Sequence, residues 1–381
     1  MNKFEWLSRL VAFDTTSRNS NLELINFINE SLLTHHIETK LIRDSTQSKA
    51  NLFAILPAQN GNRQGGLILS GHTDVVPVDG QEWQTNPFIA TQLQDKIMGR
   101  GTCDMKGFIA VVLSLVPYFL KCKLIHPIYF SFSYDEEIGC LGVPSLIDAV
   151  KAMDIKPKAC IVGEPTNMTP VVAHKGKQIF RCTLHGAAAH SSLTTSGCNA
   201  IEHAARLICF IRDLADTYQT NGPFDPYFDV PFTSLATTLI QGGNSQNTIP
   251  DSCEFTFEFR NLPEDNAHEI RKKIDDEIHH ELLPKMRREN SNAKVIVDYI
   301  GGAPGLSISE DDPLTQLVRK LTNEHAIKKV AYGTEAGLFQ EADIPTIICG
   351  PGSIDQAHRA NEYVTIDQLN KCEAFIKGLI N

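Results

Sequence analysis

The sequence predicts an α/β protein in which a mostly parallel sheet forms the main domain and a ferredoxin-like α+β domain is inserted into it. Three observations predict this fold class. The 381 residues exceed what one ordinary hydrophobic core holds, so about two domains are expected. Apolar strand-like runs alternate with helical patterns in the first part of the chain, and the pattern changes near Lys177.

The strand-like runs of the first part are short and continuously apolar. Before them, Phe4, Leu7, Leu10 and Val11 recur at helical spacing, which predicts an amphipathic helix rather than a signal peptide. The runs are "LFAILP", "GLILS", "PIYFSFS" and "ACIVGE", with helical patterns over 106–122 and 143–153 between the later ones. Strands alternating with helices favour a parallel sheet covered by helices.

The second part has a different order of elements. A strand, "IFRCTLHG", is followed by a helix over 199–218, the strands "SLATTLIQGG" and "CEFTFEFR", a helix over 264–283 and the strand "AKVIVDYI". This order is typical of a ferredoxin-like unit. After "GGAPG", a helix over 312–324, the strand "PTIICG" and a C-terminal helix resume the first pattern. We therefore expect a main domain of residues 1–176 and 303–381, with residues 177–302 inserted.

Charge and cysteine usage exclude several functional classes. The formal net charge of −10 favours neither nucleic acid nor an anionic membrane as a partner. The longest uncharged apolar stretch, 107–120, has 14 residues, whereas a membrane helix needs about 20. The ten cysteines form no CxxC pair and several lie in apolar segments, which predicts free thiols in a reducing cytoplasm.

Polar residues follow the apolar runs at five places. In an open α/β sheet the carboxyl ends of the strands form the ligand site, so these side chains are expected to converge there. A buried cluster of carboxylates and imidazoles is costly unless divalent cations neutralise it, and two ions sharing a carboxylate would explain the number of ligands. Zinc, cobalt or manganese suit such ligands. The residues are His72, Asp74, Asp104, Glu136, Glu137, Glu164 and His358.

At two of these places, residues close together in the sequence would have different roles. His72 would bind metal through one ring nitrogen while Asp74 accepts a hydrogen bond from the other. In the Glu136–Glu137 pair, one carboxylate would ligate while the other takes a proton from water. Each motif also has a structural interpretation: "HTD", "GEPT" and "GRGTCDMKG" as turns, and "DEE" as a charged loop or helix start. A dinucleotide site is disfavoured because no complete GxGxxG opens a helix. His203 fits no ligand pattern and is treated as an ordinary surface or core residue.

Taken in order, "GHTDVVP", "GRGTCDMKG", "YDEEIGCLG", "GEPT" and "AAAHSS" resemble the M20 family of metallopeptidases and amidohydrolases, over nearly the whole chain. The resemblance implies two divalent ions per subunit, zinc or cobalt. Asp104 would bridge them, His72 and Glu164 would complete one site, and Glu137 and His358 would complete the other.

The resemblance also implies the roles of the remaining site residues. Glu136 is similar to the general base and acid of the family, with Asp74 orienting His72. The Asp104–Met105 peptide bond is expected to be cis. In the inserted domain, expected to serve as lid and dimerisation domain, His190 would stabilise the oxyanion in the active site of a neighbouring subunit, which implies a homodimer.

Further resemblance concerns the substrate. Asn247 in "GGNSQNTIP" and Arg260 in "FEFR" match substrate-holding positions, and an arginine fork suits an α-carboxylate. Glu335 in "YGTEAGLF" would either meet a substrate ammonium or begin a helix.

The stretches "VVAHKG", "YGTEAGLF" and "GPGSIDQAHRANEYV" imply an N-acyl amino acid substrate, with hydrolysis of Nα-acetyl-L-ornithine to acetate and L-ornithine, a step of arginine biosynthesis, as the expected reaction. Removal of a succinyl group from N-succinyl-diaminopimelate and carboxypeptidase or aminoacylase activity stay open, because no spacing separates acetyl from succinyl. The non-enzymatic alternative is an inactive metal-binding homologue, which the intact ligand set and Glu136 argue against.

Overall fold

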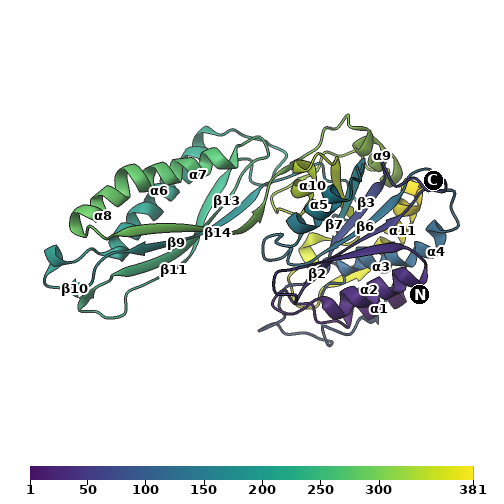
Figure 1. Ribbon diagram of the computed structural model, residues 1–381, viewed down its shortest axis with the longest axis horizontal. Helices are drawn as coiled ribbons and strands as arrows, with labels where there is room; N and C mark the ends of the chain where they lie inside the picture. Colours follow the sequence, from purple (N-terminus) through teal and green to yellow (C-terminus); the bar gives the residue numbers. More distant parts are fainter. Residues whose placement is uncertain (381) are drawn as a thin grey trace. The chain divides into compact units, whose positions relative to one another are not determined.

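The computed structural model describes residues 1–380. The chain forms two compact units (Figure 1). The first comprises Met1–Ala173, Leu306–Lys329 and the chain from Thr334 onward, and the second comprises His174–Gly305 with Val330–Gly333. The crossing points at 173/174 and 305/306 lie three residues outside the insertion expected from the sequence. Within the described chain, no helix is both long and apolar enough to cross a membrane.

The first unit contains a six-stranded mixed sheet, which confirms the predicted α/β class. Strands β6, β3, β7 and β17 are parallel neighbours, and β2 and β1 extend the sheet as antiparallel strands. The middle strands are buried on both faces, which explains why their sequences are continuously apolar. In sheet order the strands are β1 (Glu38–Arg43), β2 (Ala50–Leu56), β6 (Ile128–Ser133), β3 (Leu67–His72), β7 (Ala159–Pro165) and β17 (Thr346–Gly350).

Helices pack with this sheet into one hydrophobic core. The N-terminal helix α1 buries Trp6, Leu7, Leu10 and Val11, while Phe4 is 37% exposed, so Trp6 completes the apolar face in its place. The helix expected over 106–122 is divided in two, with Leu115 between the parts. The helices are α1 (Lys3–Val11), α2 (Leu22–Thr34), α3 (Lys106–Ser114), α4 (Val116–Phe119), α5 (Val143–Ala152), α9 (Pro313–Thr322), α10 (Ala336–Glu341) and α11 (Ile366–Ile380), with a 3-10 turn at Ile354–Gln356.

Short strands lie in the first unit and at the points where the chain passes between the two units. A small antiparallel sheet has the order β18-β5-β4, from β18 (Tyr363–Thr365), β5 (Lys96–Met98) and β4 (Thr91–Leu93). Where the chain passes from one unit to the other it forms β8 (Ala173–His174), β15 (Leu306–Ser307) and β16 (Lys329–Val330).

The second unit has the predicted order of strand, helix, two strands, helix and strand. Its four strands form an antiparallel sheet in the order β11-β13-β9-β14, and its helices lie along this sheet (Figure 1). Its second helix is longer than expected, because α7 continues through a π-helical turn into α8. The elements are β9 (Lys177–His185), α6 (Ala200–Asn221), β11 (Ser234–Gly242), β13 (Ser252–Arg260), α7 (Ala267–Asp276), the π-turn Glu277–Leu282, α8 (Leu283–Glu289) and β14 (Lys294–Ala303).

The core of the second unit follows from the alternation in β13. Phe255, Phe257 and Phe259 are buried, and the residues between them face away, as the two-residue period of a strand requires. A separate two-stranded ribbon pairs β10 (Ala189–His190) with β12 (Thr248–Ile249), and a 3-10 turn follows at Thr194–Ser196.

Candidate metal centre

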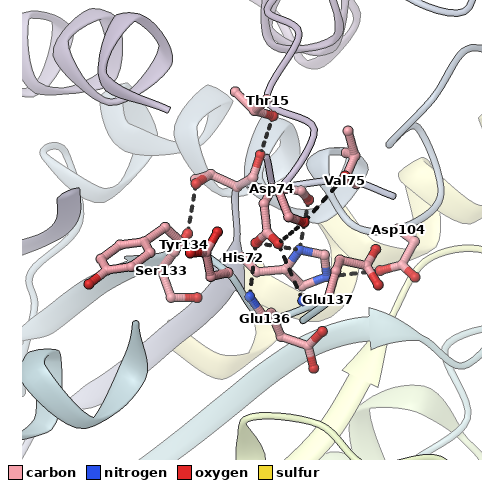
Figure 2. Close-up of polar contacts among 12 residues, drawn as sticks. Thr15, His72, Asp74, Val75, Asp104, Ser133, Tyr134, Glu136 and Glu137 are labelled. Carbon is pink, nitrogen blue, oxygen red and sulfur yellow. Dashed lines mark hydrogen bonds and ion pairs between the residues drawn. The ribbon is translucent and has the colours of Figure 1, made fainter. Parts of the chain in front are cut away.

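Acidic and imidazole side chains meet at one edge of the central sheet. Strands β3, β6 and β7 run parallel, so their carboxyl ends lie at the same edge. His72 ends β3, Glu164 lies near the end of β7, and the Glu136–Glu137 pair follows β6. Figure 2 shows His72 between Asp74 and Asp104, with Glu137 beside them.

Asp104 lies between two imidazoles. Its Oδ1 is 3.0 Å from His72 Nε2, and its Oδ2 is 3.4 Å from His358 Nε2. Each histidine also has a second carboxylate: Glu164 Oε1 lies 3.6 Å from His72 Nε2, and Glu137 Oε2 lies 2.9 Å from His358 Nε2. The structure thus brings the five expected ligands together as two groups that share Asp104.

The electrostatics of this cluster fit divalent cations. Oε1 of Glu164 is buried and has no hydrogen-bond partner. Burial raises the pKa of the Glu164 and Glu137 carboxyl groups, and loss of hydration raises the pKa of Glu136 to about 8. Burial opposes ionisation of Asp104 too, but the His358 and His72 imidazoles hold its pKa below the usual range. Cations would remove the cost of this concentrated negative charge and occupy the unpartnered oxygen.

The two histidines differ in exposure. The side chain of His72 is 1% exposed, whereas that of His358 is 55% exposed, so the cluster is reached from the His358 side. Hydrogen bonds to Asp104 and Glu137 raise the pKa of His358 to about 10. His358 must lose its extra proton before it can bind a metal ion.

Asp74 orients its neighbours through two different groups. The ring Nδ1 of His72 lies 2.9 Å from the backbone oxygen of Asp74 and 3.6 Å from its carboxylate, so the nearer acceptor is the main chain rather than the expected carboxylate. The carboxylate accepts hydrogen bonds from the backbone N–H groups of Glu136 (3.1 Å) and Glu137 (3.3 Å) and from the Ser17 hydroxyl (2.8 Å). It therefore fixes the turn that carries the acid pair (Figure 2).

Glu362 is a supporting residue that the sequence did not reveal. Its carboxylate is buried and accepts hydrogen bonds from the backbone N–H groups of Cys103 (2.8 Å) and Asp104 (3.0 Å) and from Arg100 (2.8 Å). It thereby holds the loop that presents Asp104, whose peptide bond to Met105 is cis. The signal was an acid in "ANEYV" directly before β18, but acids in such turns are usually exposed.

Glu335 lies beneath the strand ends rather than beside the ligands. It is fully buried at the start of α10, and its two oxygens accept hydrogen bonds from the hydroxyls of Ser70 (2.6 Å) and Ser133 (2.7 Å). Both oxygens are therefore used within the protein. This location corresponds to the helix-start alternative, with each oxygen already holding a serine hydroxyl.

The structure brings His190 and Asn247 together in the second unit. In the β10–β12 ribbon His190 pairs with Thr248, and the backbone N–H of Ser191 donates to the backbone oxygen of Asn247 at 2.9 Å. The Nδ1 of the exposed His190 ring accepts from the Ser192 N–H at 3.2 Å. The proton of the neutral ring is then on Nε2, which is a donor.

Arg260 lies at the other end of the same unit. It ends β13, and its Nε donates to Glu258 at 3.0 Å. The nine-residue strand separates Arg260 from Ser252, near the β10–β12 ribbon, by about 26 Å at the usual rise per residue. His190 and Arg260 of one chain are therefore too far apart to contact the same small molecule.

Comparison with known proteins places these motifs in a family. The sequence model of the family described as "Peptidase family M20/M25/M40" matches residues 68–381. The chain belongs to the M20 family. Acetylornithine deacetylase of Proteus mirabilis is 34% identical over 97% of this chain and 92% of that protein. The same enzyme of Pectobacterium carotovorum is 32% identical over 97% and 93%, respectively.

Solved structures of M20 proteins share the fold. An M20 metallo-carboxypeptidase from Sulfolobus solfataricus has a TM-score of 0.77 at 17% identity and covers 100% of this chain and 98% of its own. A dinuclear metal-binding M20 peptidase from Bacillus subtilis has a TM-score of 0.66 at 16% identity, with 99% and 96% covered. The solved structures show the shared fold, and the family match together with the ligand clusters supports a metal-dependent hydrolase.

Proposed function

We propose that the chain hydrolyses the amide bond of Nα-acetyl-L-ornithine to acetate and L-ornithine. One observation carries the chemistry: two imidazoles share the Asp104 carboxylate, with the acid Glu136 beside them. The substrate is supported by the relatives named acetylornithine deacetylase, which match this chain over nearly its full length.

Five side chains would hold two divalent ions, zinc or cobalt. They provide only nitrogen and oxygen, which suits these metals. When bound, the ions supply polarisation of the amide carbonyl and a lowered pKa of water. The residues are His72, Asp104, Glu137, Glu164 and His358.

Glu136 would move the protons of the reaction. The residue is partly exposed, and its carboxyl group accepts a weak hydrogen bond of 3.5 Å from the Cys140 thiol. Loss of hydration raises its pKa to about 8, and cations nearby would bring that pKa down towards neutrality. A carboxylate in this range can take a proton from the attacking water and give it to the leaving amine nitrogen.

The second unit would act as lid and dimerisation domain. The Nε2–H of His190 is a suitable donor for the oxyanion of the tetrahedral intermediate, and Arg260 for the substrate α-carboxylate. The length of β13 supports a homodimer in which His190 of each chain acts in the active site of its partner, while Arg260 acts in the active site of its own chain. Substrate binding would require Arg260 to exchange Glu258 for the substrate carboxylate. A cytoplasmic location stays a prediction from the cysteine pattern.

The deciding experiment is kcat/KM of the metal-loaded protein for Nα-acetyl-L-ornithine and N-succinyl-LL-diaminopimelate, measured side by side. A strong preference for acetylornithine is expected. A preference for the succinyl compound would overturn the substrate but keep the dinuclear hydrolase. Activity on neither, with N-acetyl amino acids and dipeptides also tested, would indicate an inactive metal-binding homologue.

A further inference from the structure

A second cluster of metal-ligating side chains lies in the second unit and consists of residues that the proposed reaction does not use. Cys198 precedes α6, His203 lies in the first turns of α6, and Glu289 ends α8. Each side chain offers one ligand atom, and the three atoms all lie within 4.8 Å of one another.

The contacts of this cluster leave its polar atoms poorly satisfied. Cys198 is fully buried, and its thiol makes a weak 3.8 Å contact with the Met286 backbone oxygen and interacts with the Glu289 carboxylate. His203 is 4% exposed; its Nε2 lies 2.9 Å from Glu289 Oε2, while its Nδ1 is buried without a hydrogen-bond partner. The side chain of Glu289 is 46% exposed, which gives an ion a route from solvent.

We propose that Cys198, His203 and Glu289 form a third metal site that binds a zinc-class divalent ion. Thiolate, imidazole and carboxylate are the three side-chain ligands that zinc takes in proteins, and three of them leave the fourth tetrahedral position to water. The thiolate also distinguishes this site from the centre around Asp104, whose expected ligands offer only nitrogen and oxygen.

A purely structural role explains only part of the arrangement. A structural role in which His203 and the Cys198 thiol both hydrogen-bond the Glu289 carboxylate would join α6 to α8, but it leaves the buried Nδ1 of His203 without a partner. Burial raises the pKa of Cys198 to about 11, so an ion must displace its proton, and the positive charge of Arg206 near Glu289 opposes cation binding. Affinity should therefore be moderate at neutral pH and rise with pH.

The site lies at the base of the segment that leads to His190. The backbone of Cys198 exchanges two hydrogen bonds with Ala187, of 2.9 and 3.0 Å, and the Asn290 side chain donates to the Gly186 oxygen at 2.9 Å. An ion bound between Cys198 and Glu289 would tie together the two elements that hold this segment. The binding site itself does not depend on the proposed reaction.

The test uses Co²⁺ and Zn²⁺ on the full-length, metal-depleted protein. We expect a near-ultraviolet thiolate-to-cobalt charge-transfer band from the wild type, lost in Cys198→Ser and kept in two control variants. Cys209→Ser removes an exposed thiol from the same helix, and Cys140→Ser removes the thiol that contacts Glu136. A band that survives Cys198→Ser, or no band at all, would overturn the proposal.

Zinc stoichiometry by equilibrium dialysis provides the second measurement. Glu289→Gln changes a half-exposed side chain and can still hydrogen-bond His203, so this variant should fold even if Cys198→Ser does not. We expect both variants to bind one zinc ion fewer per chain than the wild type, whatever the substrate proves to be. Equal zinc content in wild type and Glu289→Gln would contradict a site with three protein ligands.

Discussion

The backbone N–H of Asp104 donates a hydrogen bond of 3.0 Å to the carboxylate of Glu362, which is 258 residues away in the chain. The same carboxylate forms an ion pair with Arg100, and both side chains are 1% exposed. Asp104, the ligand that both proposed metal ions share, is thus held in place by a fully buried ion pair. Two consequences of such buried support, and three of the proposed chemistry, can be measured.

Replacement of Glu362 by Gln should destabilise the fold strongly. The variant leaves the buried Arg100 charge with only neutral hydrogen-bond acceptors, and breaking a buried ion pair in this way costs about 3–5 kcal/mol of unfolding free energy. Glu38→Gln is the matched control, because Glu38 pairs with Arg63 at the surface and such pairs contribute about 1 kcal/mol or less. Urea denaturation of the metal-free proteins gives both values. Equal losses in the two variants would show that Glu362 does not carry the support described.

The Glu136→Ala variant should keep its metal ions and lose turnover. None of the expected ligands is removed, but the proton acceptor is, and such groups contribute roughly 10²–10⁴-fold to rate. Metal content by elemental analysis and kcat on the preferred substrate separate the two effects. Glu82→Ala, an exposed acid outside the cluster, is the control. A kcat near that of the wild type would remove Glu136 from the mechanism.

Mixed dimers test whether His190 acts in the partner's site. His190→Ala and Glu136→Ala chains should each be inactive alone. If His190 serves the partner, a hybrid dimer contains one intact site, so an equal mixture after subunit exchange should recover about a quarter of wild-type activity. No recovery, with exchange verified by mass spectrometry, would place His190 and Glu136 of one chain in the same site.

Metal affinity should rise with pH. The pKa of His358 is raised to about 10 and that of Glu136 to about 8, so in the metal-free protein these groups hold protons at neutral pH. Ions must displace protons from the cluster, so binding weakens as pH falls and strengthens as pH rises towards the His358 pKa of about 10. Calorimetry in buffers of different ionisation enthalpy counts the protons released. An affinity that does not change with pH would show that the cluster is already deprotonated.

Two substrates, one with and one without a side-chain ammonium, can distinguish a structural role of Glu335 from a role in substrate binding. Because both of its oxygens are bound by serines, Glu335→Gln should change KM for Nα-acetyl-L-ornithine and for uncharged Nα-acetyl-L-norvaline by the same factor. The unfolding free energy should change little, since a carboxamide can accept from one serine hydroxyl and donate to the other. A KM that rises for the ornithine compound alone would assign the ammonium to Glu335 after all.

The sequence was sufficient to predict those features that depend on the pattern of neighbouring residues. Continuous apolar runs indicated buried strands, and the polar residues after them indicated one sheet edge, because parallel strands end together. The convergence of His72, Glu137 and Glu164 could be predicted for this reason. The order of elements in the second unit was likewise visible, since alternation in β13 and helical spacing are local signals.

What the sequence could not show depends on long-range contacts or on geometry within a turn. Glu362 reaches the Asp104 loop only through the folded chain. The backbone oxygen of Asp74, rather than its carboxylate, lies nearer to His72, and no residue pattern distinguishes the two acceptors. Phe4 and Trp6 are equally apolar in sequence, and only packing decides that Trp6 is the buried one.

The π-turn between α7 and α8 corrects the angular phase of a long helical segment. Its buried residues recur every four positions, at Ile270, Ile274, Ile278, Leu282 and Met286. In a regular α-helix each such step advances about 40° around the axis, so this row would turn away from the sheet within four steps. The wider turn absorbs the drift. A regular α-helix over the same residues would instead turn Met286 away from the sheet and Glu289 away from His203.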